Sequence, residues 1–159
     1  MKISEVFQIS VAKSKGTDDY LSGNTPFVTN TEVNNGIVKY VDPFDDDRIC
    51  HGPAICISGL GHATVHFGEF LPKGNGGDSC TILKPKVKLK NNELIYYAAL
   101  FNTLHGWRFS FGRKASKRRV EGLVLEPSHL EPPIDIDREI ELNNTLMLTL
   151  LKKKEAELK

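Results

Sequence analysis

Cationic side chains are concentrated in one short stretch of the sequence. An aromatic run, Phe109-Ser110-Phe111, is followed by Gly112 and then by frequent cations. Guanidinium and ammonium groups at this density can donate hydrogen bonds to a polyanion such as a nucleic acid. A solvated basic loop without a ligand has the same composition, because most basic surface clusters bind nothing specific. The cations of this stretch are Arg108, Arg113, Lys114, Lys117, Arg118 and Arg119.

The basic stretch does not reflect a uniformly basic protein. The formal net charge of the 159 residues is only +1. Acidic residues offset the cations at Asp42, at residues 45–47 and across residues 131–141. Charge is therefore segregated along the chain, and segregated charge gives one surface a preference for anions.

Polar side chains that can contact base edges recur beside glycines and at the ends of apolar runs. Amide, hydroxyl and imidazole groups form the donor and acceptor pairs that distinguish bases in the major groove, while Lys and Arg fix the register through phosphates. Each of these positions also fits ordinary turn chemistry. Together they predict one loop-rich face that contacts DNA. The candidate base-contacting residues are Thr29, Asn30, Asn34, Asn35, Ser58, His62 and Asn75.

A second hypothesis is a small β-rich metal-dependent enzyme. His62 and His66 lie four residues apart with Glu69 following, and imidazole and carboxylate groups are metal ligands. On a continuous strand, however, the two histidines share one face while Glu69 points to the other. Metal analysis of the purified protein separates the two hypotheses, because only the enzyme needs a stoichiometric metal. A third alternative is a carbohydrate- or protein-binding module whose basic loop recognises an acidic partner.

The sequence lacks the common catalytic motifs. It contains no Gly-x-Ser-x-Gly nucleophile elbow and no Walker-type phosphate loop. Its cysteines, Cys50, Cys56 and Cys80, lack the paired spacing of a zinc finger. We therefore expect no catalytic residue, no metal-ligand set and no cofactor.

Cysteine usage and hydropathy indicate the cellular compartment. Three cysteines without paired spacing argue against a disulfide framework and favour a reducing environment. The first residues show no apolar run of the signal-peptide type, and no segment reaches the roughly 20 apolar residues of a membrane helix. We therefore expect a cytoplasmic protein without a membrane partner.

Short apolar runs separated by glycine-rich turns dominate the body of the chain. Asn34-Asn35-Gly36 predicts a tight turn between two such runs, and residues 93–104 carry apolar side chains at helical spacing. The sequence therefore predicts an α+β fold, with a strand-rich twisted sheet, a small internal helix and a C-terminal helix. The expected strands are residues 25–31, 37–41, 54–58, 63–70, 79–83 and 108–111, while residues 3–11 fit a strand or a helix equally.

The composition changes after Pro132-Pro133. Apolar residues are spaced four, seven and four positions apart, as on one face of a helix over about residues 135 to 157. This face is too apolar to be left in water, so it covers its own domain or meets a second helix. We expect a body over residues 1–130 and a spacer or dimerisation helix within residues 131–159. The face is formed by Ile136, Ile140, Met147 and Leu151.

Four motifs in a fixed order carry a resemblance to a known family. They are Gly23-Asn24-Thr25-Pro26-Phe27-Val28-Thr29, Asn34-Asn35-Gly36-Ile37, Ile57-Ser58-Gly59-Leu60-Gly61 and Phe109-Ser110-Phe111-Gly112-Arg113-Lys114-Ala115. Over about residues 1 to 127, their order and spacing resemble the target recognition domain of type I restriction–modification specificity subunits. The specificity proteins of BcgI-like systems are similar.

The resemblance implies a non-catalytic module that recognises a sequence in double-stranded DNA. It also implies a partner adenine methyltransferase subunit, with a nuclease subunit as a further partner. Typical members of the family carry two recognition domains and two long helices, whereas this chain carries one domain and one short helix. A half-size subunit that forms a homodimer through the terminal helix, a fragment, and a stand-alone partner of a methyltransferase all fit this difference.

Overall fold

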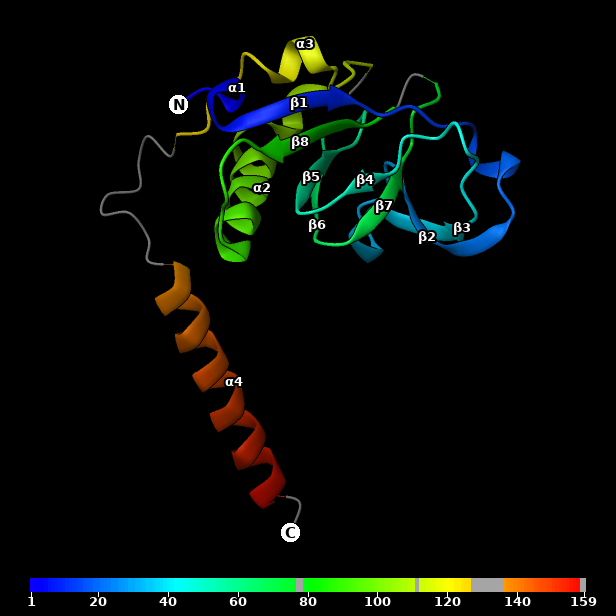
Figure 1. The fold of residues 1–159 in the computed structure, drawn as a ribbon. Coiled ribbons are helices and arrows are strands. Elements are labelled where there is room, and N and C mark those ends of the chain that lie inside the picture. Colours follow the sequence, from blue (N-terminus) through cyan, green and yellow to red (C-terminus); the bar gives the residue numbers. More distant parts are fainter. Residues whose placement is uncertain (77–78, 111, 127–135, 158–159) are drawn as a thin grey trace. The chain divides into compact units, whose positions relative to one another are not determined.

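The computed structural model describes residues 1–76, 79–110, 112–126 and 136–157, without the side chains of Ile136, Asp137 and Glu139 (Figure 1). The chain divides into two compact units, Met1–Glu126 and Pro127–Lys159. The predicted boundary between residues 130 and 131 lies outside the described residues. Among the described residues, no helix is both long enough and apolar enough to cross a membrane.

The first unit contains two four-stranded sheets. In the first sheet all neighbours are antiparallel. Its order is β1 (Phe7–Val11), β8 (Thr81–Pro85), β5 (Ala54–Ile57) and β6 (Ala63–His66). In the second sheet β2 and β7 are parallel and the other neighbours antiparallel. Its order is β3 (Ile37–Val41), β2 (Ser22–Val28), β7 (Glu69–Pro72) and β4 (Cys50–His51).

Helices and single helical turns complete the described chain. The α-helices are α1 (Ile3–Val6), α2 (Asn91–His105), α3 (Lys117–Val120) and α4 (Ile136–Glu157). The 3-10 turns are η1 (Thr17–Asp19), η2 (Asn34–Gly36) and η3 (Gly106–Phe109). The α2 helix begins where the Glu93 carboxylate accepts a hydrogen bond from the Lys90 amide at 2.6 Å, which satisfies a backbone donor at the helix start.

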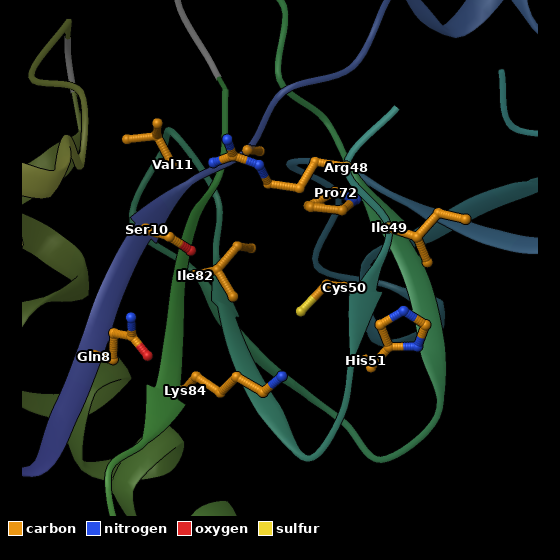
Figure 2. A pocket seen from close by; sticks show the side chains of 11 residues that line it. Gln8, Ser10, Val11, Arg48, Ile49, Cys50, His51, Pro72, Ile82 and Lys84 are labelled. Carbon is orange, nitrogen blue, oxygen red and sulfur yellow. The ribbon is translucent and has the colours of Figure 1, made fainter. Parts of the chain in front are cut away.

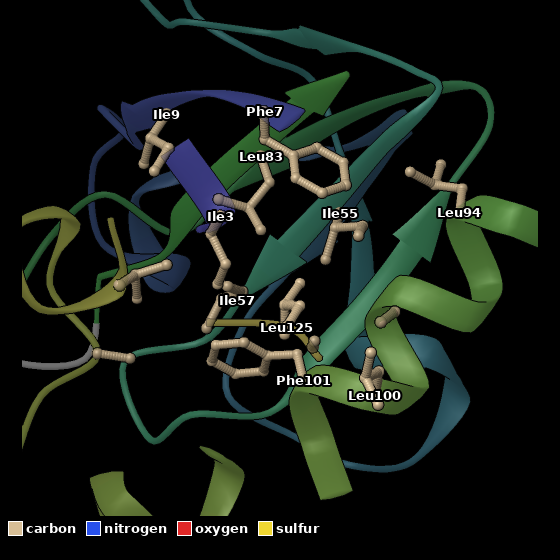
Figure 3. Close-up of a cluster of buried hydrophobic side chains, with 14 of the residues drawn as sticks. Ile3, Phe7, Ile9, Ile55, Ile57, Leu83, Leu94, Leu100, Phe101 and Leu125 are labelled. Carbon is tan, nitrogen blue, oxygen red and sulfur yellow. The ribbon is translucent and has the colours of Figure 1, made fainter. Parts of the chain in front are cut away.

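The main hydrophobic core lies between α2 and the first sheet. Leu94, Ala98 and Phe101 are buried at spacings of four and three residues, so one stripe of α2 faces the sheet. Figure 3 shows Leu94 and Phe101 of the helix on the side of the sheet that carries aliphatic side chains such as Ile55 and Ile57. A second cluster, which includes Cys56, Phe70 and Ile82, draws its members from both sheets. The sheets and α2 together form a rigid base for the loops.

The α+β prediction is confirmed, as are the helix at residues 93–104 and the turn at residues 34–36. The undecided residues 3–11 form α1 followed by β1. Two predicted strands are wrong. Residues 63–70 break at Phe67-Gly68 into β6 and β7, which belong to different sheets. In the predicted strand 108–111, residues 108–109 lie in η3 because the buried Phe109 stacks on Phe101, with ring centroids 6.1 Å apart. Phe111 lies outside the described residues.

Candidate functional site

The cations after Gly112 project from a firmly anchored segment. Ala115 and Val120 are fully buried. The Ala115 amide donates to the Gly59 carbonyl at 2.9 Å, and the Ala115 carbonyl accepts from Thr81 Oγ1 at 2.9 Å. Cations held on such an anchored segment need little further ordering to meet a ligand.

The cations of this segment differ in their exposure and in their hydrogen bonds. Arg113, Lys117 and Arg118 are exposed. Lys114 is half-buried, and its ammonium donates to the Gly76 carbonyl at 3.4 Å and to Ser79 Oγ. Arg119 donates from Nη1 to the Lys114 carbonyl at 3.1 Å. Lys114 therefore links the basic segment to Gly76 and Ser79, while the exposed side chains of Arg113, Lys117 and Arg118 remain available to bind a ligand.

The loop carrying Asn75 belongs to the same neighbourhood. Asn75 is exposed. The Gly74 amide donates to Ser14 Oγ at 2.7 Å, and that hydroxyl donates to the Pro72 carbonyl at 3.1 Å. A Cβ atom at Gly74 would overlap the backbone of Lys13 and Ser14, so only glycine allows this close approach. We call the surface formed by Asn75, Arg113, Lys114, Lys117, Arg118 and Arg119 the basic cluster.

A second group of predicted residues lies along the β6 edge of the first sheet. Asn34 and Asn35 are exposed and adopt φ angles of 50° and 52°. Asn35 donates from Nδ2 to the Val65 carbonyl at 2.8 Å. Asn102 of α2 contacts Ala63 of the same strand: its side-chain oxygen accepts from the Ala63 amide at 2.7 Å, and its side-chain nitrogen donates to the Ala63 carbonyl at 2.9 Å. These amides satisfy the free edge of β6, as edge strands require.

His62 and Asn35 line one surface depression beside that edge, together with Glu32 and Asn102. Nearby, η3 presents Trp107 with 68% of its surface exposed, and its indole Nε1 donates to the Leu104 carbonyl at 3.0 Å. The Arg108 guanidinium lies 5.0 Å from the centre of the Trp107 ring. We call Asn34, Asn35, His62, Trp107 and Arg108 the turn cluster.

The turn at residues 58–62 joins the two clusters. Its Gly59 carbonyl accepts from Ala115 of the basic segment, and its Gly61 packs against Phe109 of η3. Ser58 is only 2% exposed, and its Oγ accepts from the His62 amide at 3.1 Å. Thr29 is likewise buried and Asn30 half-buried. The Ser58 and Thr29 side chains are therefore inaccessible to a base in this conformation, which corrects their prediction as base-contacting residues.

Sequence reasoning missed two members of the site. Trp107 is the only tryptophan in the sequence, and it follows Gly106 at the end of a helix. A tryptophan at such a position could have been recognised in the sequence as a candidate for an exposed aromatic contact. Asn102 carried no such signal, because an asparagine within a helical stretch is ordinary. Its contact with β6 depends on the packing of α2 against the sheet.

The proposed ligands of the metal-enzyme alternative do not converge. His66 is buried, stacks on Phe70 with ring centroids 4.4 Å apart, and has Nε2 2.8 Å from Thr64 Oγ1. Glu69 is exposed and pairs with His51 Nδ1 at 2.9 Å. Among the described residues, no group of three or more His, Cys, Asp or Glu side chains could hold a metal ion. The metal-enzyme alternative is therefore not supported.

His66 gives the fold a specific pH dependence. Burial lowers the pKa of its imidazole to about 4, from 6.5 in the unfolded chain. The unfolded state therefore binds more protons between these values, and stability is lost as the pH falls through this window. We expect wild type to lose about 2 kcal/mol more than His66→Gln between pH 7 and pH 5, in urea unfolding at each pH. Equal losses in both proteins would contradict a neutral, buried His66.

Comparisons with known proteins complete the description of the site. A family model described as "Type I restriction modification DNA specificity domain" matches residues 1–121. No curated protein matches the sequence.

Solved structures share the fold. The specificity subunit of a type I restriction–modification system from M. genitalium has a TM-score of 0.55 at 13% identity, covering 77% of this chain and 32% of that one. The HsdS subunit from Thermoanaerobacter tengcongensis has a TM-score of 0.59 at 16% identity, covering 98% and 39%. A chain from a structure on complex assembly and conformational transition of the type I system has a TM-score of 0.61 at 18% identity, covering 98% and 40%. This chain thus spans less than half the length of each of these proteins.

Proposed function

The chain belongs to the family of type I restriction modification DNA specificity domains, and from that membership we propose that it is a non-catalytic module that recognises a sequence in double-stranded DNA. It delivers that sequence to a partner methyltransferase subunit that modifies adenine, and a nuclease subunit is a further partner of the assembly. These partners place its activity in the cytoplasm.

The basic cluster is the observation that carries this proposal. Cations from α3 and from the preceding loop project from backbone that is fixed by the buried Ala115 and Val120. Phosphate groups of a nucleic acid are the abundant polyanion that such a surface attracts, whereas a neutral carbohydrate would gain nothing from it. Family membership favours DNA over an acidic protein for the same surface.

In this proposal, cationic and neutral polar side chains make different contacts with the DNA. The exposed cations of the basic cluster contact phosphates and fix the register on the duplex; they are Arg113, Lys117, Arg118 and Arg119. The polar side chains at loop tips contact base edges. These are Asn34, Asn35, His62 and Asn75, all exposed or half-buried. The Asn34 and Asn35 amide nitrogens each donate one hydrogen bond to the backbone, so each amide keeps a second N–H to donate to a base and a carbonyl oxygen to accept from one.

Fluorescence anisotropy with duplex DNA over a series of salt concentrations tests the proposal. A single recognition domain contacts a few base pairs, so we expect weak binding, with Kd roughly 10⁻⁴ to 10⁻⁶ M at physiological salt, and a steep loss of affinity as salt rises. The purified chain should neither methylate nor cleave DNA. Binding that is absent, or that is insensitive to salt, would contradict the proposed function, and turnover by the pure chain would contradict its non-catalytic part.

The α4 helix presents an apolar face that no described residue of its own unit covers. Its described apolar side chains are 44 to 60% exposed, which is unusual for leucine and methionine in a helix. They are Ile140, Leu142, Leu146, Met147, Leu148, Leu150 and Leu151. Most of them fall on one side of the helix at spacings of three, four and seven residues. We propose that this face pairs with α4 of a second copy, which brings two recognition domains into one assembly.

Charge placed on this face should disrupt the assembly. We expect wild type to be dimeric and Met147→Glu/Leu150→Glu to be monomeric, because each glutamate would have to be buried in an apolar interface. Light scattering after size exclusion measures the molar mass. Thr145→Glu/Thr149→Glu adds the same charge on the opposite side of α4 and should remain dimeric. A monomeric wild type, or dimers in all three proteins, would overturn the pairing.

A further inference from the structure

A groove of about 230 Å³ opens between the two sheets, and its lining includes no residue of either cluster (Figure 2). One wall is formed by Gln8 and Ser10 of β1 with Ile82 and Lys84 of β8. The other wall is formed by Arg48, Cys50 and His51 at β4 and by Pro72 at the end of β7. Figure 2 shows Lys84 and Gln8 on the β1–β8 side, with His51 and Cys50 across from them.

Strand register explains why polar side chains gather here. The β1–β8 pairing sets Gln8 opposite Lys84 and Ser10 opposite Ile82, so these four side chains share one face. Phe7, Ile9 and Leu83 point to the other face and belong to the main core. Ile82 still packs in the cluster between the sheets, and beyond it the shared face becomes polar. The groove is therefore a polar opening at the edge of the apolar contact between the two sheets, and we call it the mouth of the groove.

Three polar side chains of this mouth are unpaired within the part of the chain that the structure describes. Gln8, Ser10 and Arg48 make no side-chain hydrogen bond or ion pair to any residue in the described ranges. No aspartate or glutamate appears among the groove-lining residues described. Among the lining residues, His51 pairs with a carboxylate, since its Nδ1 lies 2.9 Å from Glu69 Oε1. Burial raises the pKa of the Cys50 thiol, although the nearby Lys84 charge opposes the rise, so this thiol adds no negative charge at neutral pH.

The groove is connected to the basic cluster through contacting loops. The Arg48 amide donates to the Lys13 carbonyl at 3.3 Å, next to Ser14. Ser14 bonds to Pro72 and Gly74, and the loop beyond Gly74 reaches Lys114 through the Gly76 carbonyl. These hydrogen bonds connect the backbone at Arg48 with the loop that holds the Lys114 ammonium.

We propose that the groove binds a phosphate group of the DNA strand that the basic cluster engages, with Arg48 and Lys84 supplying the charge and Gln8 and Ser10 the further hydrogen-bond donors. Charge-assisted hydrogen bonds from a guanidinium and an ammonium are the strongest contacts that a phosphodiester makes in proteins. Continuity with the basic cluster favours a phosphate of the bound DNA over a free anion. This inference rests on the proposed function, and it adds contacts from three chain segments outside the sequence motifs.

The double variant Arg48→Ala/Lys84→Ala tests the groove in the full chain. We expect the slope of log K against log salt for duplex binding to fall by about 0.9, which corresponds to one phosphate that is no longer neutralised. Lys2→Ala/Lys88→Ala removes two exposed cations outside the groove and serves as the matched control, with a smaller change expected. If the two variants change the slope equally, the groove contributes only general charge and the inference is overturned. A wild type without salt-dependent binding would instead contradict the proposed function itself.

Nuclear magnetic resonance titrations identify the source of the phosphate. With duplex DNA we expect shifts of the backbone amides of Gln8, Ser10 and Cys50, and Arg48→Ala/Lys84→Ala should abolish them. Inorganic phosphate, added at the same ionic strength, is expected to shift these amides weakly. Shifts with inorganic phosphate but none with DNA would assign the groove to a free anion and overturn the inference. An absence of shifts with both probes would overturn it as well.

Discussion

Replacing Arg113, Lys117, Arg118 and Arg119 with alanine is expected to reduce the salt dependence of duplex binding more than any other change on the surface. Each cation that contacts a phosphate adds about 0.9 to the slope of log K against log salt, so four contacts add about 3.6. Between 50 and 200 mM salt, wild type should therefore lose about 100-fold more affinity than the variant. Anisotropy titrations at four or five salt concentrations measure both slopes.

A matched variant separates local contacts from general charge. Lys2, Lys39, Lys86 and Lys88 also lie in the first unit, and replacing all four with alanine changes the net charge by the same amount. We expect this control to retain most of the wild-type slope. Both variants need a check of folding by circular dichroism, because Arg119 and Lys86 each donate a hydrogen bond to a backbone carbonyl that the substitution removes. Equal slopes for the two variants would mean that the basic cluster has no special role.

Replacing Gly61 with alanine is expected to cost about 3 kcal/mol of unfolding free energy. Gly61 has a φ of +86°, and a left-handed residue with a Cβ costs about 1 to 2 kcal/mol. The added Cβ would also lie 2.6 Å from Phe109 Cβ and 3.0 Å from the Gly106 carbonyl oxygen. Overpacking of this kind costs about 1 to 3 kcal/mol. Urea unfolding of wild type and variant measures the difference.

Gly68 is the matched control for this substitution. No heavy atom lies within 4 Å of a Cβ built there, and it lies in the exposed turn between β6 and β7. We expect Gly68→Ala to change the unfolding free energy by less than about 0.5 kcal/mol. Gly61→Ala should also weaken DNA binding at temperatures where it remains folded, because Gly61 packs against η3, which carries Trp107 and Arg108 of the turn cluster. Equal stability of the two variants would show that the turn relaxes around the new methyl group.

Local sequence signals predicted the elements that depend on local interactions. The helix at α2 follows from its apolar spacing, and the turn at Asn34-Asn35 follows from the tolerance of asparagine for positive φ. The α+β class follows from the count of short apolar runs. Each of these signals lies within about ten residues of sequence, so no tertiary information was needed.

Tertiary packing decided the elements that the sequence misassigned. Phe109 lies in an aromatic alternation typical of a strand, but its stacking on Phe101 and its contact with Gly61 hold it in η3. Residues 63–70 contain enough apolar character for one strand, yet they divide between two sheets at Phe67-Gly68. The contact between Phe109 and Gly61 spans more than thirty residues of sequence, and the division of residues 63–70 depends on which sheet receives each strand. Neither contribution is encoded in the neighbouring residues.

The candidate site was predictable only where it is continuous in sequence. The basic cluster stood out because its cations are neighbours between residues 113 and 119. The groove could not be predicted from the sequence, since Gln8, Arg48 and Lys84 come from separate segments that only the fold brings together. Ser58 was misassigned because a serine beside glycines fits an exposed turn, whereas its hydroxyl is buried under that turn.

The central claim is that this chain selects a DNA sequence. Selection from a pool of random duplexes, followed by sequencing of the bound fraction, tests it most directly. We expect the dimeric wild type to enrich a short motif of a few base pairs, repeated at a fixed spacing, and Asn35→Ala/Asn75→Ala to lose that enrichment while retaining salt-dependent binding. A bound fraction as random as the input pool would contradict sequence recognition by this protein.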